Sequence, residues 1–260
     1  TADRDEPVQV LVSGGVEGVG PYLSNVADVS GGTIILKTDG SVYTMGNNNY
    51  GSIGNGTTDN SSHPFPTLVT ALSGVTITKI AGNGGANLAL DNTNHLWSWG
   101  YNPQGQVGDG SFSPAAPTPT QILSNVIYIA ANQYTSFAIK SDNNLWAWGS
   151  NTDGMLGTGT GDSNVPIQVL ANSSSVAVTG PFMKDVTSVA PGYNHTTATD
   201  NSGNTWVWGN NSSGQLGTSN YANQAAPFFL KDPSSNCIDP NAGPVTGGNT
   251  ILVNGTNFQS

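Results

Sequence analysis

The feature that most constrains this 260-residue sequence is a pair of short motifs that recurs four times, with a period of about fifty residues. The first motif is W-x-W-G, and its three intact copies contain all six tryptophans of the chain. The second, G-x-[ILV]-G, begins five residues after the last glycine of the first, and an asparagine stands between them. The first motif reads Tyr43-Thr-Met45-Gly46 (degenerate), Trp97-Ser-Trp99-Gly100, Trp146-Ala-Trp148-Gly149 and Trp206-Val-Trp208-Gly209; the glycines of the second are Gly51 and Gly54, Gly105 and Gly108, Gly154 and Gly157, and Gly214 and Gly217. Such spacing identifies a repeat protein.

The residues between the motifs have the pattern of strands and tight turns. Apolar residues alternate in short runs bounded by Gly, Asn, Asp and Pro, which is typical of strands rather than helices. The turn Asp200-Asn-Ser-Gly203 supplies the positive φ that a hairpin needs. One small antiparallel sheet cannot bury both of its faces, but stacked sheets can. We therefore predict an all-β fold, a β-propeller built of four-stranded antiparallel blades with one blade per repeat.

The paired tryptophans have two interpretations. Two residues apart on one strand, they point to the same face of the sheet. Such a pair is either a stacking platform for a sugar or packing between blades. Because each sheet face in a propeller is covered by the next blade, we predict that the tryptophans and motif glycines are structural. They do not identify a ligand-binding residue.

The string Trp208-Gly-Asn-Asn-Ser-Ser-Gly-Gln-Leu-Gly217 resembles the repeat of the regulator of chromosome condensation family. The resemblance covers roughly residues 7–230 and implies a seven-bladed propeller, of which about four repeats are present. One departure is that the family's usual histidine before the inner strand is kept only at His195. The matching positions hold Gly32, Ala86 and Thr135.

The repeats predict a division of the chain into two parts. Residues 1–233 form propeller repeats with cores ending near Gly54, Gly108, Gly157 and Gly217, and residues 1–10 read as the tail of a previous repeat. Either further blades lie outside this sequence, or the open arc closes against another chain. Residues 234–260 resemble the start of an immunoglobulin-like domain of the IPT/TIG family, on the strength of a Gly-Pro turn, a Gly-Gly pair and the ending Gly255-Thr-Asn-Phe258.

Composition excludes several classes of function. Six basic residues stand against sixteen acidic ones, for a net charge of −10. So few basic side chains cannot neutralise a run of phosphates, so we expect no nucleic-acid partner. No apolar run approaches the roughly 20 residues that span a bilayer. The single cysteine, Cys237, permits no internal disulfide, and we predict no cofactor.

No residue pattern indicates catalysis. His195 is the strongest candidate, because Thr196 is adjacent and Asp200 follows, but no G-x-S-x-G elbow accompanies it and we interpret it as structural. His63 and His95 have no partner at metal-ligand spacing. We do not expect the acidic run of Asp3, Asp5 and Glu6 to bind calcium, because it lies at a terminus that is prone to fraying. We predict no enzyme activity and no metal site.

The neutral polar composition and the immunoglobulin-like segment favour a secreted or cell-surface protein. Sequons for N-glycosylation give weak support; they lie at Asn55, Asn60, Asn172, Asn194, Asn210, Asn211 and Asn254. We predict a non-enzymatic extracellular binding or adhesion scaffold that recognises a protein or glycan at the cell surface. Variable loops on a rigid ring, such as residues 172–181 and 111–117, would carry recognition.

Three alternatives remain open at this point. The open edge of the propeller and the C-terminal strand favour a structural subunit that self-associates into a fibre or lattice. A propeller can also inhibit an enzyme through one face. The family resemblance implies guanine-nucleotide exchange or chromatin binding, against which the acidic charge counts.

Overall fold

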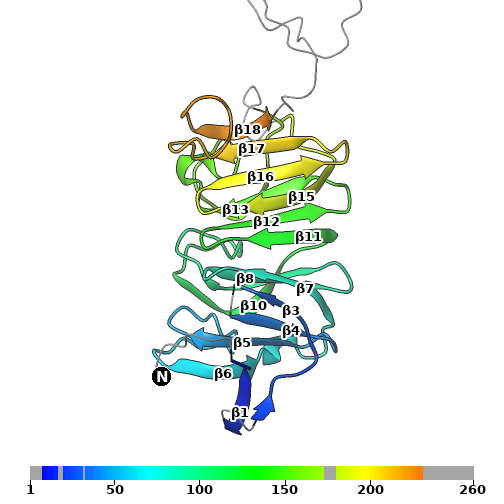
Figure 1. The fold of residues 1–260 in the computed structure, drawn as a ribbon, viewed down its shortest axis with the longest axis vertical. Coiled ribbons are helices and arrows are strands. Elements are labelled where there is room, and N and C mark those ends of the chain that lie inside the picture. The colour runs from blue at the N-terminus through cyan, green and yellow to red at the C-terminus, as the bar shows by residue number, and fades with distance from the viewer. Residues whose placement is uncertain (1–7, 17–19, 32, 173–179, 231–260) are drawn as a thin grey trace, which may run out of the picture.

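Four antiparallel sheets lie one upon the next along the long axis of the computed structural model (Figure 1). The structure describes residues 8–16, 20–31, 33–172 and 180–230. Each sheet has four strands in sequence order, so each repeat forms one blade. The predicted all-β architecture of four-stranded blades is therefore confirmed.

The strand bounds repeat from blade to blade. Blade 1 comprises β3 (Val26–Ser30), β4 (Ile34–Lys37), β5 (Val42–Asn47) and β6 (Ser62–Leu68); blade 2 comprises β7 (Ile77–Gly82), β8 (Ala86–Asp91), β9 (Leu96–Tyr101) and β10 (Ala115–Leu123). Blade 3 comprises β11 (Val126–Ala131), β12 (Thr135–Lys140), β13 (Leu145–Gly149) and β14 (Ser163–Gln168); blade 4 comprises β15 (Val186–Pro191), β16 (His195–Asp200), β17 (Thr205–Gly209) and β18 (Gln224–Leu230). A hairpin of β1 (Leu11–Val16) and β2 (Gly20–Tyr22) precedes them, and two single-turn 3₁₀ helices are η1 (Thr70–Leu72) and η2 (Thr152–Gly154).

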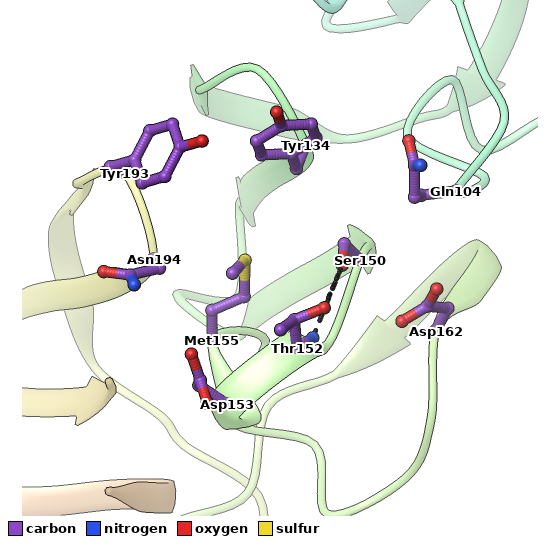
Figure 2. A pocket seen from close by; sticks show the side chains of 9 residues that line it. All are labelled: Gln104, Tyr134, Ser150, Thr152, Asp153, Met155, Asp162, Tyr193 and Asn194. Atoms are coloured by element: carbon purple, nitrogen blue, oxygen red, sulfur yellow. Dashed lines mark hydrogen bonds between the residues drawn. The ribbon is translucent and has the colours of Figure 1, made fainter. Parts of the chain in front are cut away.

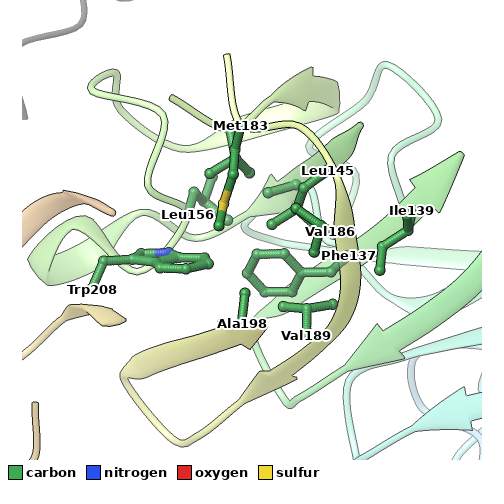
Figure 3. Close-up of a cluster of buried hydrophobic side chains, with 11 residues drawn as sticks. Phe137, Ile139, Leu145, Leu156, Met183, Val186, Val189, Ala198 and Trp208 are labelled. Carbon is green, nitrogen blue, oxygen red and sulfur yellow. The ribbon is translucent and has the colours of Figure 1, made fainter. Parts of the chain in front are cut away.

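The hydrophobic core lies between successive blades. The second tryptophan of each intact W-x-W motif is fully buried, at 0% exposure, and these residues are Trp99, Trp148 and Trp208. Figure 3 shows Trp208 of blade 4 inserted against Phe137 of blade 3, with ring centroids 6.5 Å apart and an edge-on geometry. The first tryptophan of each pair is only half-buried. The two tryptophans of one motif thus differ in environment.

The G-x-[ILV]-G motif fits against the next blade and leaves no space for a side chain. A Cβ on Gly108 would lie 2.7 Å from Nε1 of Trp148, and a Cβ on Gly105 would lie 2.6 Å from the Cα of Asn164 in β14. Both glycines also have positive φ, near 80°. The motif therefore joins one blade to the tryptophan and outer strand of the blade that follows.

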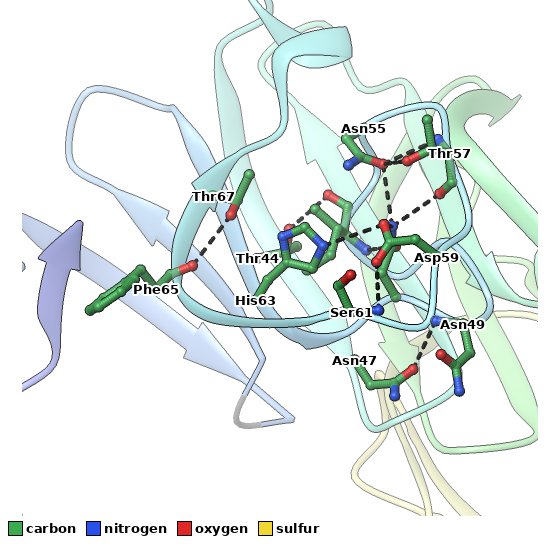
Figure 4. Close-up of polar contacts among 12 residues, drawn as sticks. Thr44, Asn47, Asn49, Asn55, Thr57, Asp59, Ser61, His63, Phe65 and Thr67 are labelled. Carbon is green, nitrogen blue, oxygen red and sulfur yellow. Dashed lines mark hydrogen bonds and ion pairs between the residues drawn. The ribbon is translucent and has the colours of Figure 1, made fainter. Parts of the chain in front are cut away.

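The asparagine between the motifs holds each long loop closed. In blade 2, Oδ1 of Asn102 accepts the Val107 N–H at 2.8 Å, and Nδ2 donates to the Ser111 carbonyl at 3.2 Å. The first of these bonds recurs in every blade, from the N–H groups of Ile53, Leu156 and Leu216 to Asn48, Asn151 and Asn211. Figure 4 shows the blade 1 loop, where Asn48 also donates to Asp59 at 2.8 Å and His63 lies 3.5 Å from the same carboxylate.

The two ends of the stack differ in polarity. The face of blade 4 that points away from blade 3, here called the leading face of blade 4, carries Thr197, Thr199 and Thr205 at positions where blade 3 has Phe137, Ile139 and Leu145. The face of blade 1 that points away from blade 2, the trailing face of blade 1, is apolar. On that face Val26 is 41% and Val29 is 62% exposed.

Several expectations lie outside the described residues. These are the acidic run at Asp3, Asp5 and Glu6, the cysteine Cys237, the position Gly32, and the IPT/TIG-like segment 234–260. None of the helices in the described part of the chain has the length and hydropathy needed to cross a membrane.

Candidate functional site

One face of the stack gathers the long loops of all four blades. The turns between first and second strands and the loops between third and fourth strands emerge on this side, which we call the loop face. The short hairpins between second and third strands emerge on the opposite side, the hairpin face. The asparagines between the motifs hydrogen-bond the third-to-fourth-strand loops and hold them in a defined conformation on the loop face.

Each blade contributes one tyrosine to a row across the loop face. Tyr50 follows β5, Tyr101 ends β9, and Tyr134 and Tyr193 occupy the first turns of blades 3 and 4. The rings of Tyr50 and Tyr101 meet edge-on with centroids 4.7 Å apart, and those of Tyr134 and Tyr193 meet in the same way at 5.8 Å. Tyr50 is 45% and Tyr193 is 67% exposed. The tyrosine row therefore presents aromatic surface to solvent.

A cleft lies beside Tyr134 and Tyr193, the two tyrosines that blades 3 and 4 contribute to the row. Its volume is about 410 Å³, and it is lined by Gln104, Tyr134, Ser150, Thr152, Asp153, Met155, Asp162, Tyr193 and Asn194 (Figure 2). The two tyrosine rings lie side by side on one wall, with Asp153 and Asp162 across from them. This volume lies within the range of about 300–1,000 Å³ that is typical of ligand sites.

The two tyrosine hydroxyls of the cleft interact. The neighbouring hydroxyl of Tyr193 raises the pKa of the Tyr134 hydroxyl above its ordinary value, and burial and the nearby hydroxyl of Tyr101 act in the same direction. A hydrogen bond joins the two turns that hold these tyrosines, since the Asn132 side chain of the blade 3 turn donates to the Gly192 carbonyl of the blade 4 turn. The aromatic wall is thus held by contacts between adjacent blades.

The carboxylates of the cleft are held by neutral donors. Asp153 accepts hydrogen bonds from the side chains of Asn210 and Asn223 of blade 4, at 2.8 and 2.9 Å. Asp162 accepts the Asn151 N–H at 2.7 Å. None of these three bonds brings a compensating positive charge.

The charges of the two faces are different. The loop face carries acidic side chains in all third-to-fourth-strand loops except that of blade 4, namely Asp59, Asp109, Asp153 and Asp162. The lysines of the described residues belong to the strand ends and connections on the hairpin-face side; they are Lys37, Lys79, Lys140 and Lys184. In the described part of the chain, the loop face therefore has aspartates without lysine or arginine.

The sequence-derived candidates lie away from this cleft. The second tryptophan of each W-x-W motif and the glycines of the first three G-x-[ILV]-G motifs lie between blades. Gly214 and Gly217 adjoin residues of their own blade 4. His195 and Asp200 are at opposite ends of β16, so they form no catalytic pair. The His195 ring packs over Gly192, Thr196 donates to the Met155 carbonyl at 2.9 Å, and Asp200 accepts Nε1 of Trp206 at 3.1 Å.

The remaining histidines each have a single acidic neighbour. His63 lies 3.5 Å from Asp59 and His95 lies 3.4 Å from Asp91. No group of three or more His, Cys, Asp or Glu side chains within the described residues has a geometry that holds a metal ion. Of the two loops expected to carry recognition, residues 111–117 lie on the loop face, whereas 172–181 belong to the opposite side and lie partly outside the described residues.

Sequence reasoning missed the tyrosine row. Tyr50 follows the third strand of blade 1 and Tyr101 ends the third strand of blade 2, whereas Tyr134 and Tyr193 follow first strands. The four therefore do not share a repeat position. No periodic signal marks them. The one local signal is that Tyr101 directly follows a W-G glycine, at the edge of a loop.

Comparison with known proteins identifies the repeats. The family model described as "Regulator of chromosome condensation (RCC1) repeat" matches residues 39–90, 94–139, 142–199 and 202–250. A second model with the same description matches residues 126–154 and 186–215. The fourth match extends into the segment that was expected to begin an IPT/TIG domain, and the comparisons show no such domain.

Relatives of known name share these repeats. The chain is 30% identical to the ultraviolet-B receptor UVR8 of Arabidopsis thaliana over 251 residues, 93% of this chain and 42% of the receptor. It is 34% identical to a bifunctional serine/threonine-protein kinase/NEDD4-like E3 ubiquitin-protein ligase of Dictyostelium discoideum over 208 residues, 74% of this chain and 11% of that protein. It is 32% identical to human protein RCC2 over 93 residues, 36% of this chain and 17% of that protein. The chain spans less than half the length of each of these relatives.

Solved structures share the fold. Human WBSCR16 superposes with a TM-score of 0.66 at 24% identity, covering 84% of this chain and 55% of that one. Prp20p of Saccharomyces cerevisiae gives the same score at 19% identity, covering 90% of this chain and 58% of that one. At these identities the likeness supports the fold.

These findings overturn the expected extracellular adhesion function, cell-surface localisation and protein or glycan partner at the cell surface. The relatives are a light receptor, ubiquitin ligases and RCC1-like proteins, and none of those named is an adhesin. The physical reason for the error is that the asparagine- and glycine-rich composition serves the blade loops and not a compartment. Asn211, counted among the sequons, is fully buried and donates Nδ2 to the Asn220 carbonyl at 2.8 Å.

The repeat spacing, the four-stranded blades and the matched family model agree with one another over most of the chain. The chain belongs to the regulator of chromosome condensation (RCC1) repeat family.

Proposed function

We propose that this chain is a protein-recognition module that binds a partner protein through its loop face and catalyses no reaction itself. The observation that carries the proposal is the tyrosine row, with one ring from each blade on a surface of fixed loops. Tyrosine supplies large contact area at low entropic cost and is enriched in protein interfaces. A row that spans four blades fits an extended macromolecular contact better than a small molecule.

The relatives support a binding role for the repeats. In the Dictyostelium ligase the match covers 11% of the protein, and in human HERC2 it covers 2%, so the repeats form one part of a much larger enzyme. The same fold in yeast RCC1 (Prp20) has been solved bound to Kap60, which supports protein binding by a scaffold of this kind.

Site-specific photo-crosslinking in the source organism tests this function. A photoreactive phenylalanine replaces Tyr50 or Tyr193 on the loop face, or Asn92 or Ser202 on the hairpin face, in the full chain. We expect discrete protein adducts from the two loop-face positions and none from the hairpin-face positions. The partner so identified, once purified, should bind the unmodified chain and lose binding to Tyr50→Ala/Tyr193→Ala. Equal adducts from both faces, or none from the loop face, would overturn the proposal.

We also propose, from sequence resemblance alone, that residues 234–260 begin an IPT/TIG-like unit separate from the propeller of residues 1–233. Limited proteolysis with mass spectrometry tests this division. Cleavage between residues 231 and 240 that leaves the four blades intact is expected. A protected unit that continues from residue 202 to residue 250 would instead assign the segment to the fourth repeat, as the family match has it.

A further inference from the structure

We propose that the cleft beside Tyr134 and Tyr193 receives the cationic side chain of a lysine- or arginine-containing segment of the partner protein. This inference rests on the proposed function, because it names the chemistry of the partner that the loop face would recognise. The cleft combines an exposed aromatic wall with two carboxylates and lies on a face without lysine or arginine in the described part of the chain.

The aromatic wall suits a cation. Tyr193 is 67% exposed, and the ring of its neighbour Tyr134 packs edge-on against its ring with centroids 5.8 Å apart. An aromatic face attracts an ammonium or guanidinium group that lies within about 6 Å of its centroid. This chain already uses the same contact elsewhere, since Nζ of Lys79 lies 5.8 Å from the centroid of Tyr128.

The carboxylates add charge to this attraction. Asp153 and Asp162 lie across the cleft from the tyrosines and bond only to amide donors in the contacts described above. An arginine that enters the cleft therefore meets a ring on one side and acceptors on the other. The lining amides of Gln104 and Asn194 add neutral hydrogen-bonding groups that fit the several N–H donors of a guanidinium.

The remainder of the row sets the length of the partner segment. Tyr101 and Tyr50 extend the aromatic surface from blade 3 back to blade 1, and Asp59 and Asp109 lie in the adjoining loops. A single amino acid would leave most of this surface uncovered. An extended basic segment, with one side chain seated in the cleft, would cover it.

Fluorescence anisotropy with a labelled peptide tests the inference directly. The probe is an unstructured peptide with arginine at every second position, and the matched control peptide carries glutamate at those positions. We expect saturable binding of the arginine peptide alone, weakened when salt is raised from about 50 to about 300 mM. The variants Tyr193→Ala and Asp162→Asn should each weaken binding at least fivefold.

Two control variants separate the cleft from general acidity. Asp142→Asn removes an exposed carboxylate from the hairpin face. Tyr221→Ala removes a tyrosine that is 74% exposed in the third-to-fourth-strand loop of blade 4, on the loop face but outside both the cleft lining and the tyrosine row. Both should bind the arginine peptide like the unmodified chain. If the control variants weaken binding as much as the cleft variants, or if no variant weakens it, the cleft assignment is wrong. The crosslinking result would stand in either case, so failure of the cleft assignment is distinguishable from failure of the proposed function.

Discussion

At the scale of single residues, equivalent blades use different chemistry for the half-buried tryptophan. In blade 2, Nε1 of Trp97 donates to Oδ2 of Asp91 at 3.0 Å. Blade 3 has Lys140 at the position of that aspartate; its Nζ lies 5.3 Å from the ring centroid of Trp146, whose Nε1 is buried without a partner among the described groups. The same two arrangements recur in blades 4 and 1, as Asp200 with Trp206 and Lys37 with Tyr43.

The aspartate arrangement makes stability depend on pH. Burial alone would raise the pKa of Asp91, but hydrogen bonds from Trp97, Thr93 and the His95 N–H outweigh it and lower the pKa from 3.8 to about 2. Because the pKa of Asp91 is lower in the folded chain than in the unfolded chain, its ionised form stabilises the fold at any pH above the unfolded-state pKa. This contribution is lost as the pH falls from about 4 to about 2. We expect Asp91→Asn to lower the free energy of unfolding by about 2 kcal/mol at pH 7, and by progressively less towards pH 2.

Chemical denaturation at a series of pH values measures this difference. The control Asp142→Asn changes an exposed carboxylate in the next hairpin turn and should leave the free energy of unfolding nearly unchanged at pH 7. A difference between Asp91→Asn and the unmodified chain that stays constant from pH 7 to pH 2 would contradict the assignment.

At the scale of elements, the unit of structure is the junction between a G-x-[ILV]-G loop and the following blade. Gly157 has φ +69°, and a Cβ there would lie 2.9 Å from Nε1 of Trp208 and 3.1 Å from Val169. The indole Nε1–H of Trp208 in turn donates to the carbonyl of Met155, which lies in the same loop as Gly157, at 2.9 Å. Loop and tryptophan therefore fix each other across the boundary between blades.

Substitution of a junction glycine should be far more costly than substitution of a loop glycine. Gly157→Ala should lower the free energy of unfolding by about 2–4 kcal/mol, because the added methyl group meets Trp208 and positive φ disfavours alanine. Gly161→Ala in the same loop is the matched control, since a Cβ there meets nothing within 4 Å. Thermal and denaturant unfolding of both variants measure the effect, and equal losses would contradict this role of the junction.

Much of the element level was predictable from sequence, and the site was not. The spacing of W-x-W-G and G-x-[ILV]-G predicted blades because backbone conformation and local packing are set within one repeat. The row from Tyr50 to Tyr193 arises only when blades stack, since its members occupy different repeat positions. His195 and Asp200 look close along the chain, but an extended strand separates them. Composition misled about the compartment because asparagines such as Asn102 are buried structural residues.

At the scale of the whole molecule, the stack has an apolar end and a polar end. Val26 and Val29 are exposed on the trailing face of blade 1, whereas their counterparts in blade 3, Val126 and Ile129, are buried. On the leading face of blade 4 the threonines hydrogen-bond within their own blade. Thr199 shares a hydrogen bond with the Ser188 hydroxyl at 2.5 Å, and Thr197 donates to the Ala190 carbonyl at 3.4 Å. These two faces are therefore poorly matched for head-to-tail contact between copies of the four-blade stack.

Introducing the blade 3 residues on the leading face of blade 4 should create a head-to-tail contact between copies. The triple variant Thr197→Phe/Thr199→Ile/Thr205→Leu gives the leading face of blade 4 the three apolar side chains found at the equivalent positions of blade 3. We expect it to self-associate with increasing concentration in analytical ultracentrifugation, whereas the unmodified chain keeps a constant sedimentation coefficient. Adding Val29→Lys on the trailing face of blade 1 should abolish the association. Association that survives Val29→Lys would show that the new apolar face does not bind the trailing face.

The threonine face of blade 4 also bears on how an array like this can lengthen in evolution. When a repeat array lengthens by duplication of a unit, each new unit must offer an apolar surface to the unit that follows it in the stack. A copy of blade 3 inserted before blade 4 meets this requirement at once, because Phe137, Ile139 and Leu145 already fit the back of a blade. A second copy of blade 4 placed after the first would not meet this requirement, because the first copy would offer it threonines in place of apolar side chains. We therefore expect duplication of blade 3 to be tolerated directly, whereas duplication of blade 4 requires its threonines to change first.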